Sequence, residues 1–270
     1  MKKTAIVSVV GAFIVACSST NPFTNSKGLN IVSNDAIFPT AFQQYSDFLK
    51  ENKVVSGTKE ALLVENVGKK IQKAAETYLA SIGQADYLKD YRWEFKLVQD
   101  DAVNAWCMPG GKIVVYTGIL PVTKTEAGLA TVMGHELAHA LANHGAQRMS
   151  NAQLQQLGAV AVQAATGNKT EESQAAWQQA YGIGSNVLGV LPFSRKHESE
   201  ADEIGLTLMA IAGYNPDEAV SFWQRMSAAS GGGSTLEILS THPSDATRVA
   251  NLQKLIPQAK TTAKKFGVNF

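Results

Sequence analysis

Cysteine and net charge are both scarce in this chain, and each scarcity excludes a class of protein. Of the 270 residues, 2 are cysteine, and the formal net charge is +1. A scaffold held together by several disulfides is excluded, because two cysteines can form one bridge at most. The nearly neutral net charge does not indicate a protein that binds nucleic acid, because such proteins carry an excess of basic residues.

Internal repeats and long apolar runs are also missing. The apolar run at residues 5–16 is too short for an ordinary membrane-spanning helix. The composition, with 45% hydrophobic and 17% charged residues, is that of a folded globular protein. At this length we expect one sizeable domain or two small ones.

Histidine is rare as well, with 5 in the chain, yet two of them form the motif His135-Glu136-Leu137-Ala138-His139. The apolar flanks predict a buried helix, on which positions i and i+4 share a face with about 5–6 Å between Cβ atoms. Zinc accepts imidazole nitrogens at about 2.0–2.1 Å, and a carboxylate beside the first ligand can act as a general base. We therefore predict one Zn²⁺ held by His135 and His139, with Glu136 as the base. The alternative is a pair of ordinary helix histidines.

A third ligand is expected downstream, in a predicted helix that begins near Ser194 and stops at Gly213. Glu198 and Asp202 are four residues apart, so Glu198 can bind zinc while Asp202 accepts the N–H of a ligating imidazole. Glu200 lies about 200° further round the helix and is the reserve ligand. A solvated cluster of charges at a helix start is the alternative interpretation.

Four motifs together resemble a known family. They are NAWCMPGGKIVVYTGIL at residues 104–120, GHELAHALANHGAQRMS at 134–150, SRKHESEADEIGL at 194–206 and THPSDATR at 241–248. The combination resembles the gluzincin metallopeptidases grouped with HtpX and the CAAX-prenyl endopeptidases. Within them it is most similar to the lipoprotein branch represented by LoiP, with the BepA-type proteases as relatives. The resemblance implies a zinc endopeptidase in which Glu198 is the third metal ligand.

By the same resemblance, the edge of a sheet beside the metal binds extended substrate through backbone hydrogen bonds. Asn104 and Ala105 match that position. An added strand gives affinity with little reading of sequence, which suits a protease with broad substrates. The alternative is that Asn104 merely turns the chain.

The resemblance also implies a role for His242, either as a displaceable fourth zinc ligand or as a donor to the transition state. Arg248 would then orient this loop or stabilise developing charge. His242 as an ordinary loop histidine is the alternative. For His144 and His197 we expect no role, because both are expected to point away from the ligands.

The N-terminus has the layout of a secretory signal, with Lys2 and Lys3 before the apolar run. Ile14-Val15-Ala16-Cys17 resembles a bacterial lipobox, which implies cleavage after residue 16 and acylation of Cys17. The following Ser18 favours, by analogy, the periplasmic face of the bacterial outer membrane. A plain cleaved signal peptide is the alternative.

The expected fold class is α+β and zincin-like, mostly helical, with a small mixed sheet beside the active-site helix. We expect a signal peptide at 1–16, a lipidated N-terminus and polar tether at 17–30, and the metallopeptidase domain at 31–270. The stretches 152–167 and 180–193 are interpreted as ordinary packed helices, with a cover for the cleft or a contact with lipid or a partner as the alternative. Periodicity predicts helices at 38–52 and 60–82 and strands at 91–98, 102–108 and 112–116.

The sequence thus predicts a zinc-dependent endopeptidase acting in protein quality control at the bacterial cell envelope. Unfolded or misassembled envelope proteins are the expected substrates, and an envelope protein and the membrane, through the lipid anchor, are the expected partners. The competing hypothesis is a chaperone-like or binding lipoprotein whose zinc is structural or latent. Structural zinc has four protein ligands, whereas catalytic zinc keeps an exchangeable position.

Overall fold

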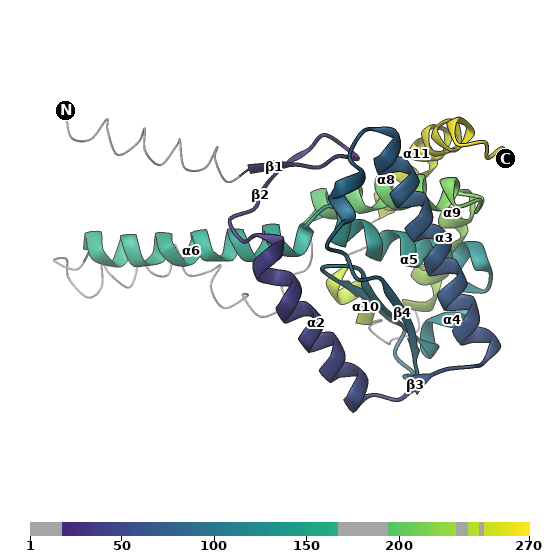
Figure 1. Cartoon of the computed structure of the whole chain (residues 1–270), viewed down its shortest axis with the longest axis horizontal. Coiled ribbons are helices and arrows are strands. Elements are labelled where there is room, and N and C mark those ends of the chain that lie inside the picture. Colours follow the sequence, from purple (N-terminus) through teal and green to yellow (C-terminus); the bar gives the residue numbers. More distant parts are fainter. Residues whose placement is uncertain (1–17, 167–193, 231–236, 243–245) are drawn as a thin grey trace.

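The computed structural model describes residues 18–166, 194–230, 237–242 and 246–270, and it shows a helical body built around a small sheet (Figure 1). This confirms the expected α+β, zincin-like class. The predicted signal segment, Cys17 and residues 167–193 lie outside the described residues.

The helices are α2 (Asn34–Glu51), α3 (Lys59–Ser81), α4 (Leu120–Thr123), α5 (Glu126–Leu141), α6 (His144–Thr166), α8 (Arg195–Ile211), α9 (Glu218–Ser230), α10 (Glu237–Thr241) and α11 (Ala246–Lys265), with 3-10 turns η1 (Ala85–Leu88) and η2 (Thr117–Ile119). The strands are β1 (Ser18–Thr20), β2 (Lys27–Leu29), β3 (Val54–Val55), β4 (Glu94–Val98), β5 (Ala105–Met108) and β6 (Lys112–Tyr116).

The main sheet is mixed, with strand order β3-β4-β6-β5. β4 and β6 run parallel, while β3 and β5 pair antiparallel with their neighbours. Side chains alternate between the two faces of a strand. Ile113 and Val115 of β6 accordingly join the main core with α3 and α5, whereas Val114 and Tyr116 pack with Tyr45 of α2 on the other face. The predicted alternation in β4 is also confirmed, because Phe95 and Leu97 are buried.

β5 is an edge strand of this sheet. It reaches β6 through the turn at Pro109, Gly110 and Gly111, in which the two glycines have φ angles of +85° and +88°. Such angles favour glycine, since a Cβ is strained there. The turn pairs Met108 with Lys112 and lays β5 beside α5.

Helices α5 and α8 cross with their backbones in contact. Thr125 caps α5, because its side chain accepts a hydrogen bond of 2.9 Å from the backbone N–H of Gly128. A Cβ added to Gly134 would lie 3.1 Å from the backbone oxygen of Gly205, and one added to Gly205 would lie 3.0 Å from the carbonyl carbon of Gly134. These two glycines therefore permit the close crossing that places His135 against α8.

The polar segment that was expected to be a tether folds onto the body instead. β1 and β2 form a short antiparallel hairpin in which Ser18 pairs with Leu29. Three side chains between the strands, those of Asn21, Thr24 and Ser26, donate hydrogen bonds to Glu200 of α8. The hairpin is therefore held in place by a buried carboxylate that the sequence alone did not connect to it.

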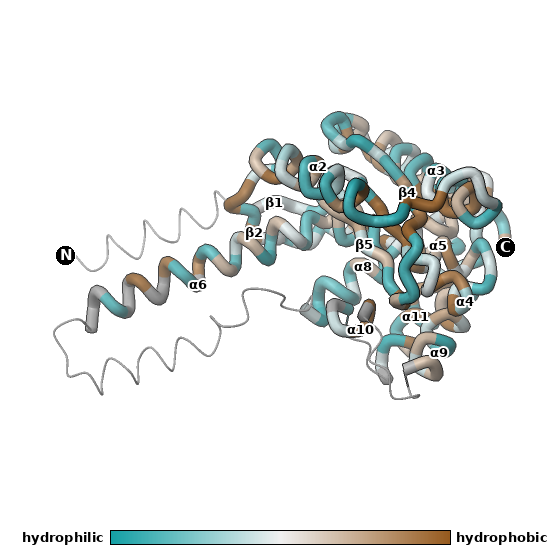
Figure 2. The backbone as a smooth tube through the Cα atoms, turned by 90° about the horizontal axis from the view of Figure 1, so that it is seen from below, coloured by the Kyte–Doolittle hydropathy of each residue, from teal (hydrophilic) through white to brown (hydrophobic). Residues whose placement is uncertain are grey.

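Helix α6 leaves the body along most of its length (Figure 1). Its beginning packs against α5 and β2, and polar and apolar residues alternate along it (Figure 2). Leu157 and Val160 are 64% and 59% exposed, so the expectation of an ordinary packed helix is wrong for them. Residues rich in Ala and Gln sustain a helix through intrinsic propensity. Among the described helices, none has the combination of length and hydropathy needed to cross a membrane.

Candidate metal centre

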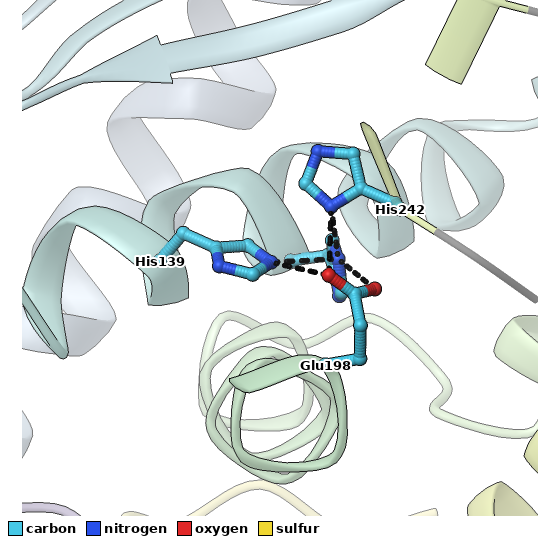
Figure 3. Close-up of side chains that lie close together, drawn as sticks. His139, Glu198 and His242 are labelled. Carbon is cyan, nitrogen blue, oxygen red and sulfur yellow. Dashed lines mark hydrogen bonds and ion pairs between the residues drawn. The ribbon is translucent and has the colours of Figure 1, made fainter. Parts of the chain in front are cut away.

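Four buried side chains meet where α5 and α8 cross. His135 and His139 come from α5, Glu198 from the first turn of α8, and His242 from the residue after α10. One donor atom of each lies within 4.8 Å of the donor atoms of the others, and all four residues are 5% exposed or less. Figure 3 shows His139, Glu198 and His242 converging on one point. The structure thus brings together the predicted ligands and the predicted fourth position.

The distances between these donor atoms fit tetrahedral zinc. Nε2 of His135 lies 3.1 Å from Nε2 of His139 and 3.3 Å from Nδ1 of His242. Oε1 of Glu198 lies 3.3 Å from Nε2 of His139 and 3.1 Å from Nδ1 of His242. Ligands at about 2.0–2.1 Å from a tetrahedral ion are about 3.3–3.4 Å apart.

Hydrogen bonding alone does not account for the cluster, because a neutral imidazole carries one N–H. Nδ1 of His135 lies 3.0 Å from Oδ1 of Asp202 and donates to it, so its Nε2 presents a lone pair. Nδ1 of His139 contacts Nδ1 of His144 at 2.9 Å, which turns the other nitrogen of His139 inward. Lone pairs and a carboxylate therefore converge on one point, an arrangement that a cation stabilises.

The electrostatics of the site favour positive charge at its centre. Burial and Arg248 oppose a charge on His135, but Glu198 and Asp202 outweigh them and raise its pKa to about 9. Burial opposes ionisation of Glu198, yet the charge of His135 and its hydrogen bonds with the three histidines hold its pKa far below the usual value. Burial lowers the pKa of His139 well below the usual value, so this imidazole is neutral and able to bind metal.

Glu136 lies beside the four ligand atoms without being one of them. It is buried, and among the described residues its Oε1 has no hydrogen-bond partner. Nε2 of His242 is 3.6 Å from this oxygen. Burial raises the pKa of Glu136 above the usual carboxylate value, which makes it a stronger base. An orphaned carboxylate oxygen next to the ligands fits a group that accepts a proton from water.

Asp202 and Arg248 are not ligand candidates, but they form hydrogen bonds with the ligand candidates His135 and Glu198. Arg248 donates from Nη2 to Oδ1 of Asp202 at 2.6 Å and from Nη1 to Oε2 of Glu198 at 3.2 Å. Its guanidinium lies over the ring of Trp223, 3.4 Å from the centroid. These contacts fix the two carboxylates, a role that differs from the orientation of the His242 loop or the stabilisation of developing charge implied by the resemblance.

The prediction that His144 points away from the ligands is wrong. Asn143 has a φ angle of +55°, so the chain leaves α5 in a left-handed turn and His144 swings back onto His139. Asparagine visits this conformation more readily than most residues, which is the signal that the sequence offered. His197 is also buried; it stacks on His144 with 4.3 Å between ring centroids.

Glu200 was the reserve ligand, and it reaches the metal centre indirectly. Its Oε2 accepts a hydrogen bond of 3.3 Å from Nε2 of His144. Burial raises its pKa, but the bonds from His144, Ser26 and Thr24 prevail and lower it to about 2. Glu200 therefore carries a full negative charge one histidine away from the ligand His139.

The predicted substrate positions lie on the edge strand beside the metal centre. Asn104 precedes β5 and Ala105 is its first residue, and both are buried. Oδ1 of Asn104 accepts a hydrogen bond of 2.9 Å from the backbone N–H of Ala105. The backbone carbonyl of Asn104 pairs with Tyr116 of β6 at 3.1 Å.

Comparison with known proteins places this geometry in a family context. The model of peptidase family M48 matches residues 66–256. The mitochondrial metalloendopeptidase OMA1 of Schizosaccharomyces pombe is 34% identical over 88% of this chain and 66% of the relative. OMA1 of Arabidopsis thaliana is 37% identical over 70% of this chain and 36% of the relative. The beta-barrel assembly-enhancing protease of Yersinia pestis is 31% identical over 63% of this chain and 37% of the relative.

These relatives correct one expectation and support another only in its broader form. The predicted location at the bacterial outer membrane is contradicted, because the yeast and plant relatives are named as mitochondrial enzymes. The matches support the M48 family as a whole and not the narrower likeness to the HtpX group or its LoiP branch. In each of these three relatives, the matched region spans less than two thirds of the protein.

Proposed function

The chain belongs to peptidase family M48, and from this membership we propose that it is a zinc-dependent endopeptidase. The observation that carries the proposal is the convergence of His135, His139 and Glu198 beside the orphaned oxygen of Glu136. Three such ligands with an adjacent carboxylate are the donor set of a catalytic zinc. When bound, zinc supplies Lewis-acid activation of water and of the scissile carbonyl.

The residues around the ligands perform the proton transfers and the positioning. Glu136 accepts the proton of the attacking water and later delivers it to the leaving amine. Asp202 keeps His135 in the tautomer whose Nε2 faces the metal. Arg248 neutralises Asp202 and holds the carboxylate of Glu198 in place.

Substrate is proposed to bind as an added strand along β5, beside Asn104 and Ala105. The support for this is the edge position of β5 and its packing against α5. Backbone pairing requires an extended chain, which a folded protein rarely presents. We therefore propose unfolded or misassembled proteins as the substrate class, in a quality-control role.

The alternative, a chaperone-like or binding protein with a structural zinc, makes the opposite prediction in a direct test. Purified zinc-loaded protein should cleave unfolded casein, and removing the metal with a chelator should abolish cleavage until zinc is restored. Fragments are measured by mass spectrometry. Binding of casein with no cleavage by the zinc-replete protein would favour the alternative.

Acylation of Cys17 is proposed from the tetrad at residues 14–17 alone. Lipid chains anchor through buried CH₂ groups worth about 0.8 kcal/mol each, so an acylated chain sediments with membranes. Mass spectrometry of residue 17, together with sedimentation of Cys17→Ser, tests the proposal. An unmodified Cys17 would contradict it.

His242 is proposed to cap the resting site as a fourth, displaceable ligand. The support is that its Nδ1 lies 3.1 Å from Glu198 and 3.3 Å from His135, within the ligand cluster. If His242 held the metal together with the other three residues, a substrate carbonyl would compete with its imidazole for the ion. His242→Ala should therefore keep its zinc and cleave short peptides several-fold faster, as measured by steady-state kinetics on metal-analysed protein.

The same variant separates the other roles of His242. If the imidazole stabilises the transition state, kcat and kcat/KM should fall together in His242→Ala. An unchanged kcat/KM would contradict both functional roles and leave a loop histidine. Equal zinc content in wild type and variant is the control.

A further inference from the structure

A continuous line of polar contacts joins the zinc-ligand candidate His139 to the N-terminal hairpin. Nδ1 of His139 lies 2.9 Å from Nδ1 of His144, and Nε2 of His144 lies 3.3 Å from Oε2 of Glu200. The other oxygen of Glu200 accepts hydrogen bonds from three side chains of the hairpin. These donors are Nδ2 of Asn21 at 2.7 Å and the hydroxyl groups of Thr24 and Ser26.

The protons along this line have one consistent arrangement. His139 offers the lone pair of Nε2 to the metal, so its single N–H is on Nδ1 and donates to Nδ1 of His144. His144 then carries its own proton on Nε2 and donates to the carboxylate of Glu200. Each imidazole is thus fixed in one tautomer by the next group, with the charge of Glu200 at the end.

The residues that connect His139 to the hairpin are buried. His144 is fully buried, while Asn21 is 6% and Glu200 is 8% exposed. A buried carboxylate requires hydrogen-bond donors, and the hairpin supplies three from a segment that lies 174 to 179 positions away in the sequence. A plain polar tether needs no such contact.

The two histidines of the α5 motif are thus held by two carboxylates of α8 in different ways. Asp202 holds His135 directly and is neutralised by buried Arg248. Glu200 holds His139 through His144, and its hairpin donors are neutral groups on a two-stranded hairpin. A movement of the N-terminal segment would break the hydrogen bonds between the hairpin and Glu200, and it would leave the contact between Asp202 and His135 intact.

We propose that the hairpin at residues 18–29 is a positioning element for the zinc ligand His139, acting through Glu200 and His144. This inference rests on the proposed zinc site. Loss of the hairpin donors leaves Glu200 buried with fewer hydrogen bonds, so the carboxylate and His144 reorient. His139 then loses its fixed tautomer and orientation, and zinc affinity falls.

The test measures zinc affinity rather than activity. The full-length double variant Thr24→Val/Ser26→Ala removes two donors to Glu200, and Glu200→Gln removes the charge. The matched control is Ser19→Ala, which alters the same hairpin but removes a hydroxyl that bonds Asn30 rather than Glu200. Zinc dissociation constants come from chelator competition, and the visible spectrum of Co²⁺-substituted protein reports the geometry of the ligands.

Loss of such a support around a metal ligand typically costs about 10–100-fold in affinity, which is the expectation for Glu200→Gln. The double variant should bind zinc several-fold more weakly, with an altered Co²⁺ spectrum, while Ser19→Ala and the conservative Thr24→Ser match wild type. A double variant with a lower Tm but unchanged zinc affinity and Co²⁺ spectrum would overturn the inference. A wild-type protein that binds no zinc would instead overturn the proposed function.

Discussion

Replacing Glu136 with glutamine should leave zinc bound and reduce kcat by about 10²–10⁴-fold, the usual contribution of a general base. The amide has the same shape as the carboxylate but does not accept the proton of water. The ligand atoms of His135, His139 and Glu198 are untouched, so metal content should stay at one zinc per chain. Casein cleavage and metal analysis on the same sample provide the measurement.

The matched control is Glu126→Gln, the same chemical change on the same helix. Glu126 lies in the first turn of α5 with its side chain 59% exposed. The activity of the Glu126→Gln variant should equal that of wild type. Full residual activity in Glu136→Gln would refute the assignment of the base, and loss of zinc would show that Glu136 is a ligand.

Local sequence patterns predicted most of the elements that frame the site. The i, i+4 spacing of His135 and His139 determines where both imidazoles point once the helix is formed. The periodicity of 91–98 predicted β4, and the patterns at 102–108 and 112–116 predicted β5 and β6. Each of these signals comes from neighbouring residues, and each element begins and ends within a few residues of its prediction.

Features that depend on long-range contacts were not predictable in the same way. Asn21 and Glu200 are far apart in the sequence, and no local pattern indicates that a polar segment will cover a buried carboxylate. His144 was expected to point away from the ligands, but the left-handed conformation of Asn143 interrupts the helix between His139 and His144, and the two rings come into contact. The close crossing at Gly134 and Gly205 likewise became apparent only with both helices in place.

The register of α8 decides which carboxylate binds zinc, and Glu198→Ala should lose most of the metal. Oε1 of Glu198 lies 3.1 to 3.3 Å from two ligand nitrogens, and no other side chain of α8 joins the cluster of four donor groups in the described residues. An alanine leaves three imidazoles and removes the negative charge that helps bind a divalent ion. Zinc per chain after dialysis should fall from one to near zero.

Two variants on the same helix make this loss specific. Glu203→Ala, a control at a position that touches Gln258 rather than a ligand, should retain one zinc per chain after the same dialysis. Glu200→Ala should also retain zinc under excess metal but bind it more weakly in competition, because it acts through His144. If Glu200→Ala strips the metal while Glu198→Ala keeps it, Glu200 is the ligand and the register of α8 assigned here is wrong.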